Sequence, residues 1–274
     1  MTTGPKPADE SADARDSQNF IRALARGLAA IEAMGARADG VTLSELAGVC
    51  DLDRATTRRI LLTLGELGYV RSSANRFLLA PRVLSLGYAY LSSIPFWELA
   101  NPVMERLVRT LHESCSAATL DGTDAVYVAR VRSSERVIDV SRTIGSRIPA
   151  YCTSLGRVLL AAESVDRREE LLRRSSLVAH TKHTIVDRRK LMKILSEVRE
   201  QGYALVDQEL ELGLRSLAVP IADRSGKVVA ALNTSVQPTR VSAAEMLKKY
   251  LPVLKATAAE LGQARQARSG NQVL

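Results

Sequence analysis

The sequence predicts an α+β protein, with a winged helix-turn-helix near its N-terminus followed by an antiparallel sheet flanked by helices. Three observations lead to this prediction. Two short helical patterns and a hairpin pattern follow one another between residues 42 and 80. After residue 116 the apolar period changes from helical to alternating. Hairpins and helices then follow one another to residue 265, an order that is typical of the α+β class.

The first helix of the N-terminal module is predicted to begin at Thr42. Thr42 and Glu45 have the spacing of a capping box, in which hydroxyl and carboxylate groups bind free amides at a helix start. Asp53 is a good N-cap for a second helix, whose apolar residues recur at helical spacing. Gly68 is predicted to end that helix, as glycine does at the C′ position.

A hairpin and an upstream helix complete the predicted module. Strand-like runs at 69–70 and 77–79 enclose turn-forming residues at 72–75. Upstream, an apolar stripe at helical spacing predicts a helix that packs on these elements. The stripe consists of Ile21, Leu24, Leu28 and Ile31.

The first turns of the second helix carry side chains that suit DNA contact. In helix-turn-helix proteins this end of the helix meets base edges in the major groove. Arginine pairs with guanine, and threonine contacts a thymine methyl group or a phosphate. An arginine near the hairpin tip would contact phosphate or the minor groove. The alternative is a solvated helix face with ordinary surface charges. The candidate residues are Arg54, Thr56, Thr57, Arg58 and Arg76.

Length and composition agree with a two-domain globular protein. The chain has 274 residues, 46% of them hydrophobic and 25% charged. A net charge of +8 fits a polyanionic partner, although the charge is spread along the chain and locates none. No apolar run approaches the ~18 residues of a membrane helix, and the N-terminus lacks the apolar core of a secretory signal. We therefore expect a cytoplasmic protein without membrane contact.

The sequence offers little for catalysis, a metal or a cofactor. The three cysteines are widely spaced, which predicts reduced thiols. His180 and His183 stand three residues apart without an obvious third ligand. No nucleophile elbow, phosphate loop or dinucleotide fingerprint is present. We predict no catalytic residues, no metal and no cofactor; an enzyme that uses Cys152 or His183 is the alternative from another class.

Composition also predicts where the segments of the chain begin and end. The polar N-terminus has no periodicity, and the segment Val83–Leu91 is apolar nearly all round. An exposed linker would not be so apolar, so we expect a partner subunit to cover it. The predicted segments are a disordered arm at 1–19, the winged helix-turn-helix at 20–80, a linker helix at 81–97, the second domain at 98–265 and a flexible tail at 266–274.

The second domain is predicted to alternate between strands and helices. Turn residues at 121–124 and 223–226 separate its hairpin strands. The predicted strands are 117–120, 125–131, 137–140, 204–206, 217–222 and 228–236, and the predicted helices are 97–111, 155–162, 166–174, 187–201 and 242–265.

A candidate anion site lies where Thr153 leads into the helix at 155–162. Free amides at a helix N-terminus bind carboxylates or phosphates. Simple N-capping by Thr153 is the alternative. Asn233 and Ser235 alternate on one face of their strand, and such residues would line a small-molecule pocket if that face points inward. If it points outward, they are merely solvated.

Several longer motifs carry a family resemblance. They are residues 24–28 (LARGL), 58–64 (RRILLTL), 67–70 (LGYV), 127–130 (YVAR), 153–160 (TSLGRVLL) and 202–216 (GYALVDQELELGLRS). With these motifs the chain resembles the IclR family of transcriptional regulators over residues 18 to 265. Within the family it is similar to the branch that controls aromatic degradation through the β-ketoadipate pathway.

The resemblance implies a GAF-like effector domain behind a module that binds double-stranded operator DNA. It also implies homodimers that pair again as a dimer of dimers. Effectors in the family are small carboxylates, and here protocatechuate, 4-hydroxybenzoate and β-ketoadipate are the leading aromatic or dicarboxylic candidates. The pocket maps onto Ser154, Leu155, Asp207, Ser216, Asn233 and Ser235.

Two points stay open in this interpretation. Arg142, Arg147 or Arg215 would suit a bidentate pair with a carboxylate, although each is more often a surface charge. The second domain would bind no ligand at all if it served only for oligomerisation.

Overall fold

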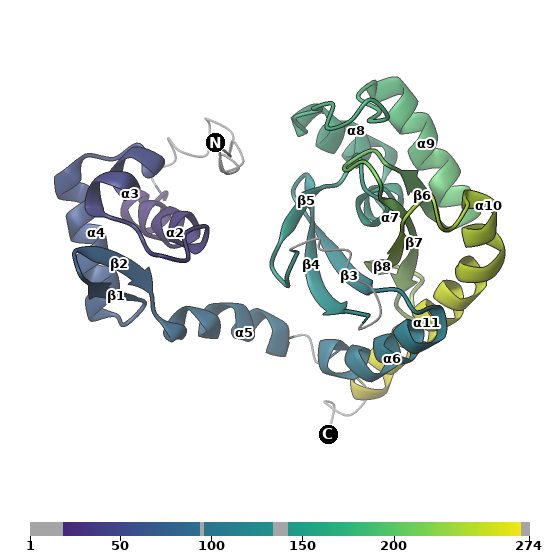
Figure 1. Cartoon of the computed structure of the whole chain (residues 1–274), viewed down its shortest axis with the longest axis horizontal. Coiled ribbons are helices and arrows are strands. Elements are labelled where there is room, and N and C mark those ends of the chain that lie inside the picture. Colours follow the sequence, from purple (N-terminus) through teal and green to yellow (C-terminus); the bar gives the residue numbers. More distant parts are fainter. Residues whose placement is uncertain (1–18, 94–95, 134–141, 270–274) are drawn as a thin grey trace. The chain divides into compact units, whose positions relative to one another are not determined.

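The computed structural model describes residues 19–93, 96–133 and 142–269, and the chain forms two compact units, Met1–Tyr90 and Leu91–Leu274 (Figure 1). Three sequence predictions lie outside the described residues. They are the disordered arm, apart from its last residue, the strand at 137–140 and the end of the C-terminal tail.

The described part of the first unit begins with helices α2 (Arg22–Gly35), α3 (Leu43–Cys50) and α4 (Arg54–Glu66). The predicted capping box of α3 is confirmed: the Thr42 amide donates to Glu45 Oε2 at 2.7 Å and the Glu45 amide donates to Thr42 Oγ1 at 3.3 Å. Asp53 caps α4 by accepting from the Thr56 amide at 2.8 Å. These caps fix where each helix of the pair begins, and so fix the turn between them.

A two-stranded wing follows α4. Gly68 has a φ of +77° just after that helix, as predicted for a glycine stop. Strands β1 (Val70–Ser73) and β2 (Arg76–Leu79) pair antiparallel with Ser73 opposite Arg76. The two residues between them, Ala74 and Asn75, both have positive φ, which is the backbone of a tight hairpin turn.

The predicted apolar stripe of α2 is wrong in one respect. Ile21, Leu24 and Leu28 are exposed, whereas Ala30 and Met34 of the same helix are buried. The first unit therefore buries a different side of α2 than the stripe suggested, and leaves three large apolar side chains uncovered. The buried core of this unit comprises Ala30, Met34, Val41, Leu46, Leu61, Leu64 and Val70.

A short 3-10 turn, η1 (Pro81–Val83), leads from the wing into helix α5 (Leu84–Ser93). Proline at the first position suits this turn, because its missing N–H has no partner there in any case. Helix α6 (Phe96–Leu111) begins the second unit and carries Pro102 inside its first two turns.

The second unit is built on a six-stranded antiparallel sheet in the order β5-β4-β3-β8-β7-β6 (Figure 1). Helices lie on both of its faces, which confirms the predicted α+β class. Its strands are β3 (Cys115–Asp121), β4 (Asp124–Val131), β5 (Arg147–Pro149), β6 (Ala204–Asp207), β7 (Arg215–Ala222) and β8 (Val228–Val236).

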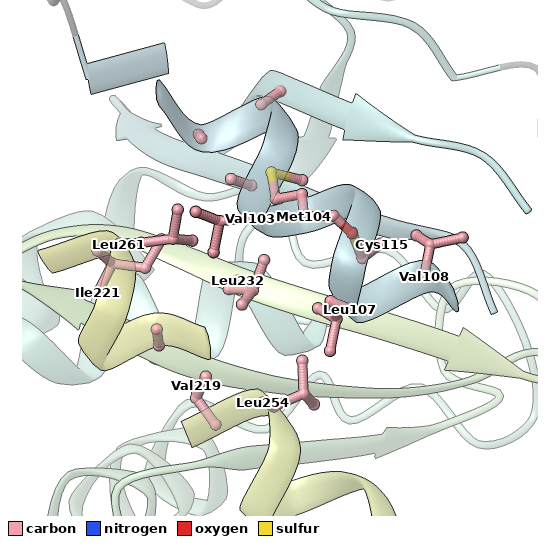
Figure 2. Packing of buried hydrophobic residues seen from close by; sticks show 14 of the residues in the cluster. Val103, Met104, Leu107, Val108, Cys115, Val219, Ile221, Leu232, Leu254 and Leu261 are labelled. Atoms are coloured by element: carbon pink, nitrogen blue, oxygen red, sulfur yellow. The ribbon is translucent and has the colours of Figure 1, made fainter. Parts of the chain in front are cut away.

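Each face of the sheet has its own apolar core. On one face, α6 and the C-terminal helix α11 (Leu251–Ser269) cover the sheet, and Figure 2 shows their side chains meeting those of the strands. On the other face, α7 (Ser154–Ala162), α8 (Val165–Arg174) and α9 (Arg188–Gln201) form a second cluster with the sheet. The cavity described below lies on this second face.

Two elements differ from the sequence prediction. The short edge strand β5 was not predicted, because three residues are too few to show a period. The last helix was predicted as one piece but has three parts: α10 (Ala243–Glu245), a π-helical turn η2 (Met246–Tyr250) and α11. Pro252 accounts for the wide turn, since proline lacks an N–H and its ring clashes with the carbonyl four residues earlier.

Candidate functional site

The start of α4 presents three of the predicted DNA contacts. Arg54 and Arg58 are exposed and lie one helical turn apart, on the same side of the helix. Thr56 is half-buried beside the cap, where its hydrogen bonds lower the pKa of the Asp53 carboxyl. Two cations on one exposed stripe at a capped helix start form a surface that suits the major groove.

The other two predicted contacts need correction. Thr57 is 1% exposed, and its hydroxyl donates to the Asp53 carbonyl at 2.9 Å, so it belongs to the helix core. Arg76 begins β2 at the wing tip, but its guanidinium turns back. Its Nε donates to the Asp39 carbonyl and its Nη2 to the Gly40 carbonyl, both at 3.0 Å. The Arg76 side chain therefore bonds the wing to the loop between α2 and α3 and does not project from the wing tip.

Two exposed cations near these residues were not among the predicted contacts. Arg59 follows Arg58 on α4, and Arg71 lies on β1 of the wing. Their charge alone was the available signal, and charge alone does not separate a contact from a solvated surface.

The second unit contains a cavity of about 30 Å³ at the N-terminus of α7. Its walls come from α7 and the loop before it, from strands β4 to β8 of the sheet, and from the β6–β7 connection. The residues around it are Tyr127, Arg142, Ile148, Cys152, Thr153, Ser154, Leu155, Val206, Glu209, Leu210, Glu211, Leu214, Ser216, Asn233 and Ser235.

A cluster of four polar side chains forms one wall of this cavity. The Ser154 and Ser216 hydroxyl oxygens are 2.7 Å apart. Asn233 Nδ2 and Ser235 Oγ donate to Ser216 Oγ at 2.9 and 3.0 Å. Ser216 and Ser235 face each other across β7 and β8, so the alternation predicted from sequence points inward. Ser216 is the centre of the cluster.

The amides at the start of α7 complete this wall. Thr153 caps the helix as predicted, because its Oγ1 accepts from the Gly156 amide at 3.2 Å. Among the described residues, no acceptor is found for the amides of Ser154 and Leu155, and both residues are buried. Capping and anion binding are therefore compatible, since the cap uses a different amide from the two that remain.

Asp207, which was predicted to bind the effector, does not line this cavity. Its neighbour Val206 lines the cavity, because successive side chains of β6 point to opposite faces of the sheet. Asp207 Oδ2 instead accepts from Arg215 Nη2 at 2.8 Å, and Arg215 Nη1 also donates to the Val241 carbonyl. Asp207 borders a separate, open hollow of about 400 Å³ between β6 and α9.

A buried ion pair lies beside the cavity. Arg157 of α7 and Glu209 of the β6–β7 connection are 2.6 Å apart, and both side chains are more than nine-tenths buried. Arg157 Nε also donates to the Tyr151 carbonyl at 2.8 Å, and the Ile185 amide donates to Glu209 Oε2 at 3.0 Å. Glu209 was not predicted as a site residue, because nothing in the pattern of that connection separates it from the exposed Glu211.

The three arginines that were candidates for pairing with a carboxylate have different partners in the structure. Arg147 pairs with Asp121 and Asp124 at the surface. Arg215 forms an ion pair with Asp207, as described above. Arg142 lines the cavity and pairs only loosely with Glu211, at 3.4 Å.

The cysteines and histidines give no support to catalysis. Burial raises the pKa of Cys152 and of Cys115 to about 12, so both thiols stay protonated and poorly nucleophilic at neutral pH. Across residues 19–93, 96–133 and 142–269, no group of three histidine, cysteine or carboxylate side chains is placed to hold a metal. Every helix in the described part of the chain is too short or too polar to cross a membrane.

Comparison with known proteins places these features in context. The family model of the bacterial transcriptional regulator IclR C-terminal domain matches residues 88–263, and that of the IclR helix-turn-helix domain matches residues 23–74. A Pca regulon regulatory protein from Pseudomonas putida is 45% identical over 243 residues, which cover 89% of this chain and 84% of that protein.

Two solved structures share the fold. A transcriptional regulator from Rhodococcus sp. RHA1 is 46% identical, with a TM-score of 0.79 over 90% of this chain and 99% of that one. An IclR homolog from Microbacterium hydrocarbonoxydans, solved as a complex with 4-hydroxybenzoate, has a TM-score of 0.78 and covers 89% of this chain and 99% of its own. It is 23% identical, so this likeness concerns the fold.

Proposed function

Since the chain belongs to the IclR family of transcriptional regulators, we propose that it controls genes of aromatic-acid catabolism in response to a small carboxylate effector. The observation that carries the proposal is the cavity at the N-terminus of α7, where two buried amides and a hydroxyl cluster meet. The name of the Pseudomonas relative supports the pathway, and the 4-hydroxybenzoate complex of the Microbacterium homolog supports the kind of ligand.

In this proposal the effector carboxylate binds over the first turn of α7. The amides of Ser154 and Leu155 donate to it, and the positive end of the helix dipole stabilises its charge. The remainder of the ligand lies along Ser216, Asn233 and Ser235. Binding then acts on DNA affinity by favouring one of two arrangements of the DNA-binding pair.

Titration calorimetry with protocatechuate, 4-hydroxybenzoate and β-ketoadipate tests this proposal. At least one acid is expected to bind the full-length protein and to change its affinity for its own promoter DNA. If none of the three binds, the effector class is wrong. If one binds without any effect on DNA affinity, the regulatory coupling is wrong.

For DNA, we propose that Arg54, Thr56 and Arg58 contact the major groove from the start of α4. Thr57 and Arg76 are left out, since one is buried and the other is bonded to the protein backbone. The protein would meet its operator in the cytoplasm.

Replacing Arg58 with alanine is expected to weaken operator binding by about 1–3 kcal/mol, the range of a good base-edge contact. The fold should survive, because this side chain is exposed. Fluorescence anisotropy at fixed salt measures the change on operator and on random DNA. Arg173→Ala, at an exposed arginine of α8, is the matched control and should bind normally. An equal loss on both DNAs would reassign Arg58 to phosphate contact.

We further propose that the protein is a homodimer held through α2 and α5, and that dimers pair again. Leu84 and Tyr88 lie one turn apart on α5 and are 74% and 64% exposed. With the exposed stripe of α2, they form more apolar surface than a stable monomer usually shows. A second copy of the chain is the natural cover, since symmetric dimers also match the two half-sites of an operator.

The double variant Leu84→Glu, Tyr88→Glu is expected to halve the sedimenting mass at micromolar concentration, because it would place two charges in the interface. Sedimentation velocity makes the measurement. Leu212→Glu, at an exposed leucine of the second unit, is the control and should sediment like the wild type. A wild-type protein that sediments as a monomer would refute the proposal.

A further inference from the structure

A row of polar side chains crosses three strands on the cavity face of the sheet. Arg130 of β4 pairs with Ser116 of β3, and Ser116 pairs with Asn233 of β8. Asn233 lines the cavity. Neighbouring strands are about 4.8 Å apart, so the backbone of Arg130 lies about 10 Å from that of Asn233. The adjacent residues Ala129 and Leu232 pack into the core on the opposite face.

A β-bulge puts Arg130 on this face. Ala117 pairs with Ala129 and Ala118 with Tyr127, so Val128 is an extra residue in β4. Tyr127 lines the cavity, and without the extra residue a side chain three positions further on would point the other way. The bulge therefore directs an arginine toward the cavity side of the sheet.

The guanidinium of Arg130 is incompletely satisfied. Its Nε is buried, and the described residues provide no acceptor for it. Burial lowers the pKa of Arg130, and repulsion from Arg132 and Arg142 adds to this effect. A half-buried cation near two others is unfavourable unless an anion joins them.

The described carboxylates around the cavity do not supply that anion. Glu209 is fully engaged with Arg157. Glu211 pairs with Arg142 at 3.4 Å, and its side chain is half exposed. Among the described residues, the side of the cavity near Arg142 and Arg130 therefore carries more positive than negative charge, whereas the α7 side offers amides and hydroxyl groups.

We propose that Arg130 and Arg142 form a second anion subsite beside the cavity, so that the effector is a dicarboxylic acid held at both ends. One carboxylate binds at the N-terminus of α7, and this part rests on the function proposed above. The other binds the two arginines, each of which offers the planar fork that suits a carboxylate. Among the leading candidates, β-ketoadipate has this chemistry and 4-hydroxybenzoate does not.

Calorimetry with adipate and its monomethyl ester tests the second subsite. The two probes have similar chains, but the ester lacks one charge. Wild-type protein is expected to bind adipate at least about tenfold more tightly, the effect of a charge-assisted hydrogen bond. Arg130→Gln should remove this preference and leave the affinity for the ester unchanged. Arg147→Gln removes the same charge at a surface pair and should keep the preference.

Each other outcome overturns the inference in its own way. Equal binding of both probes by the wild type, or a preference that survives Arg130→Gln, would show that the second subsite does not exist. Tight binding of 4-hydroxybenzoate without adipate would overturn the inference and leave the proposed function standing. If no acid binds, the proposed function fails as well. Should Arg130→Gln fold poorly, Arg142→Gln is expected to reduce the same preference.

Discussion

Replacing Arg157 with methionine is expected to destabilise the second unit by about 3–5 kcal/mol, the usual cost of breaking a buried ion pair from one side. Methionine replaces the aliphatic stem of arginine but has neither its guanidinium nor its charge, so Glu209 would be left buried without its cation. The Tyr151 carbonyl would also lose its donor. Urea denaturation followed by circular dichroism measures the change, with the linear extrapolation giving the free energy of unfolding.

A second variant separates the charge from the packing. Adding Glu209→Gln to Arg157→Met removes the orphaned charge, and the glutamine oxygen still accepts from the Ile185 amide. The double variant is expected to recover more than half of the lost stability. If it is no more stable than Arg157→Met, the loss comes from packing around α7 and the buried charge contributes little.

Replacing Ser154 with proline is expected to weaken effector binding by about 1.5–3 kcal/mol, the range for a hydrogen bond to a charged group. Proline removes the amide at the first position of α7, where the helix needs no donor. Thr153 is already extended, with φ −126° and ψ 149°, as a residue before proline must be. Calorimetry with the acid that binds the wild type measures the loss.

Ser154→Ala is the matched control, because it removes the hydroxyl bonded to Ser216 and keeps the amide. The difference in effector affinity between Ser154→Pro and Ser154→Ala therefore gives the contribution of the Ser154 amide. Equal affinities for proline and alanine at this position would contradict binding over the helix N-terminus. DNA affinity without effector should be the same in both variants, since the change lies in the other unit.

Local sequence signals predicted the helix starts well. Thr42, Asp53 and Thr153 each cap the helix expected of them, because a cap depends on residues only three apart. The family resemblance is confirmed by models that match both parts of the chain. Ser216 and Ser235 meet as their alternation suggested, since strand period and pairing agree.

Several misses depend on strand register or on contacts with residues that are distant in the sequence. Asp207 and Val206 differ by one position, and that one position decides which side of the sheet a residue faces. Arg130 reaches the cavity face through a bulge that depends on the partner strand β3. Glu209 is buried by contacts with Arg157 and Ile185, both distant in sequence. No periodicity in a single chain records such pairings.

The size of the cavity has a consequence for how tightly any effector is held. The cavity has a volume of about 30 Å³, which is small beside an organic acid, so we expect its walls to move apart when an effector binds. The observed dissociation constant is then the intrinsic one divided by the fraction of molecules already open. A weak measured affinity is compatible with excellent complementarity. If an effector binds as proposed, we expect this cost to make the protein respond only at ligand concentrations well above the intrinsic dissociation constant.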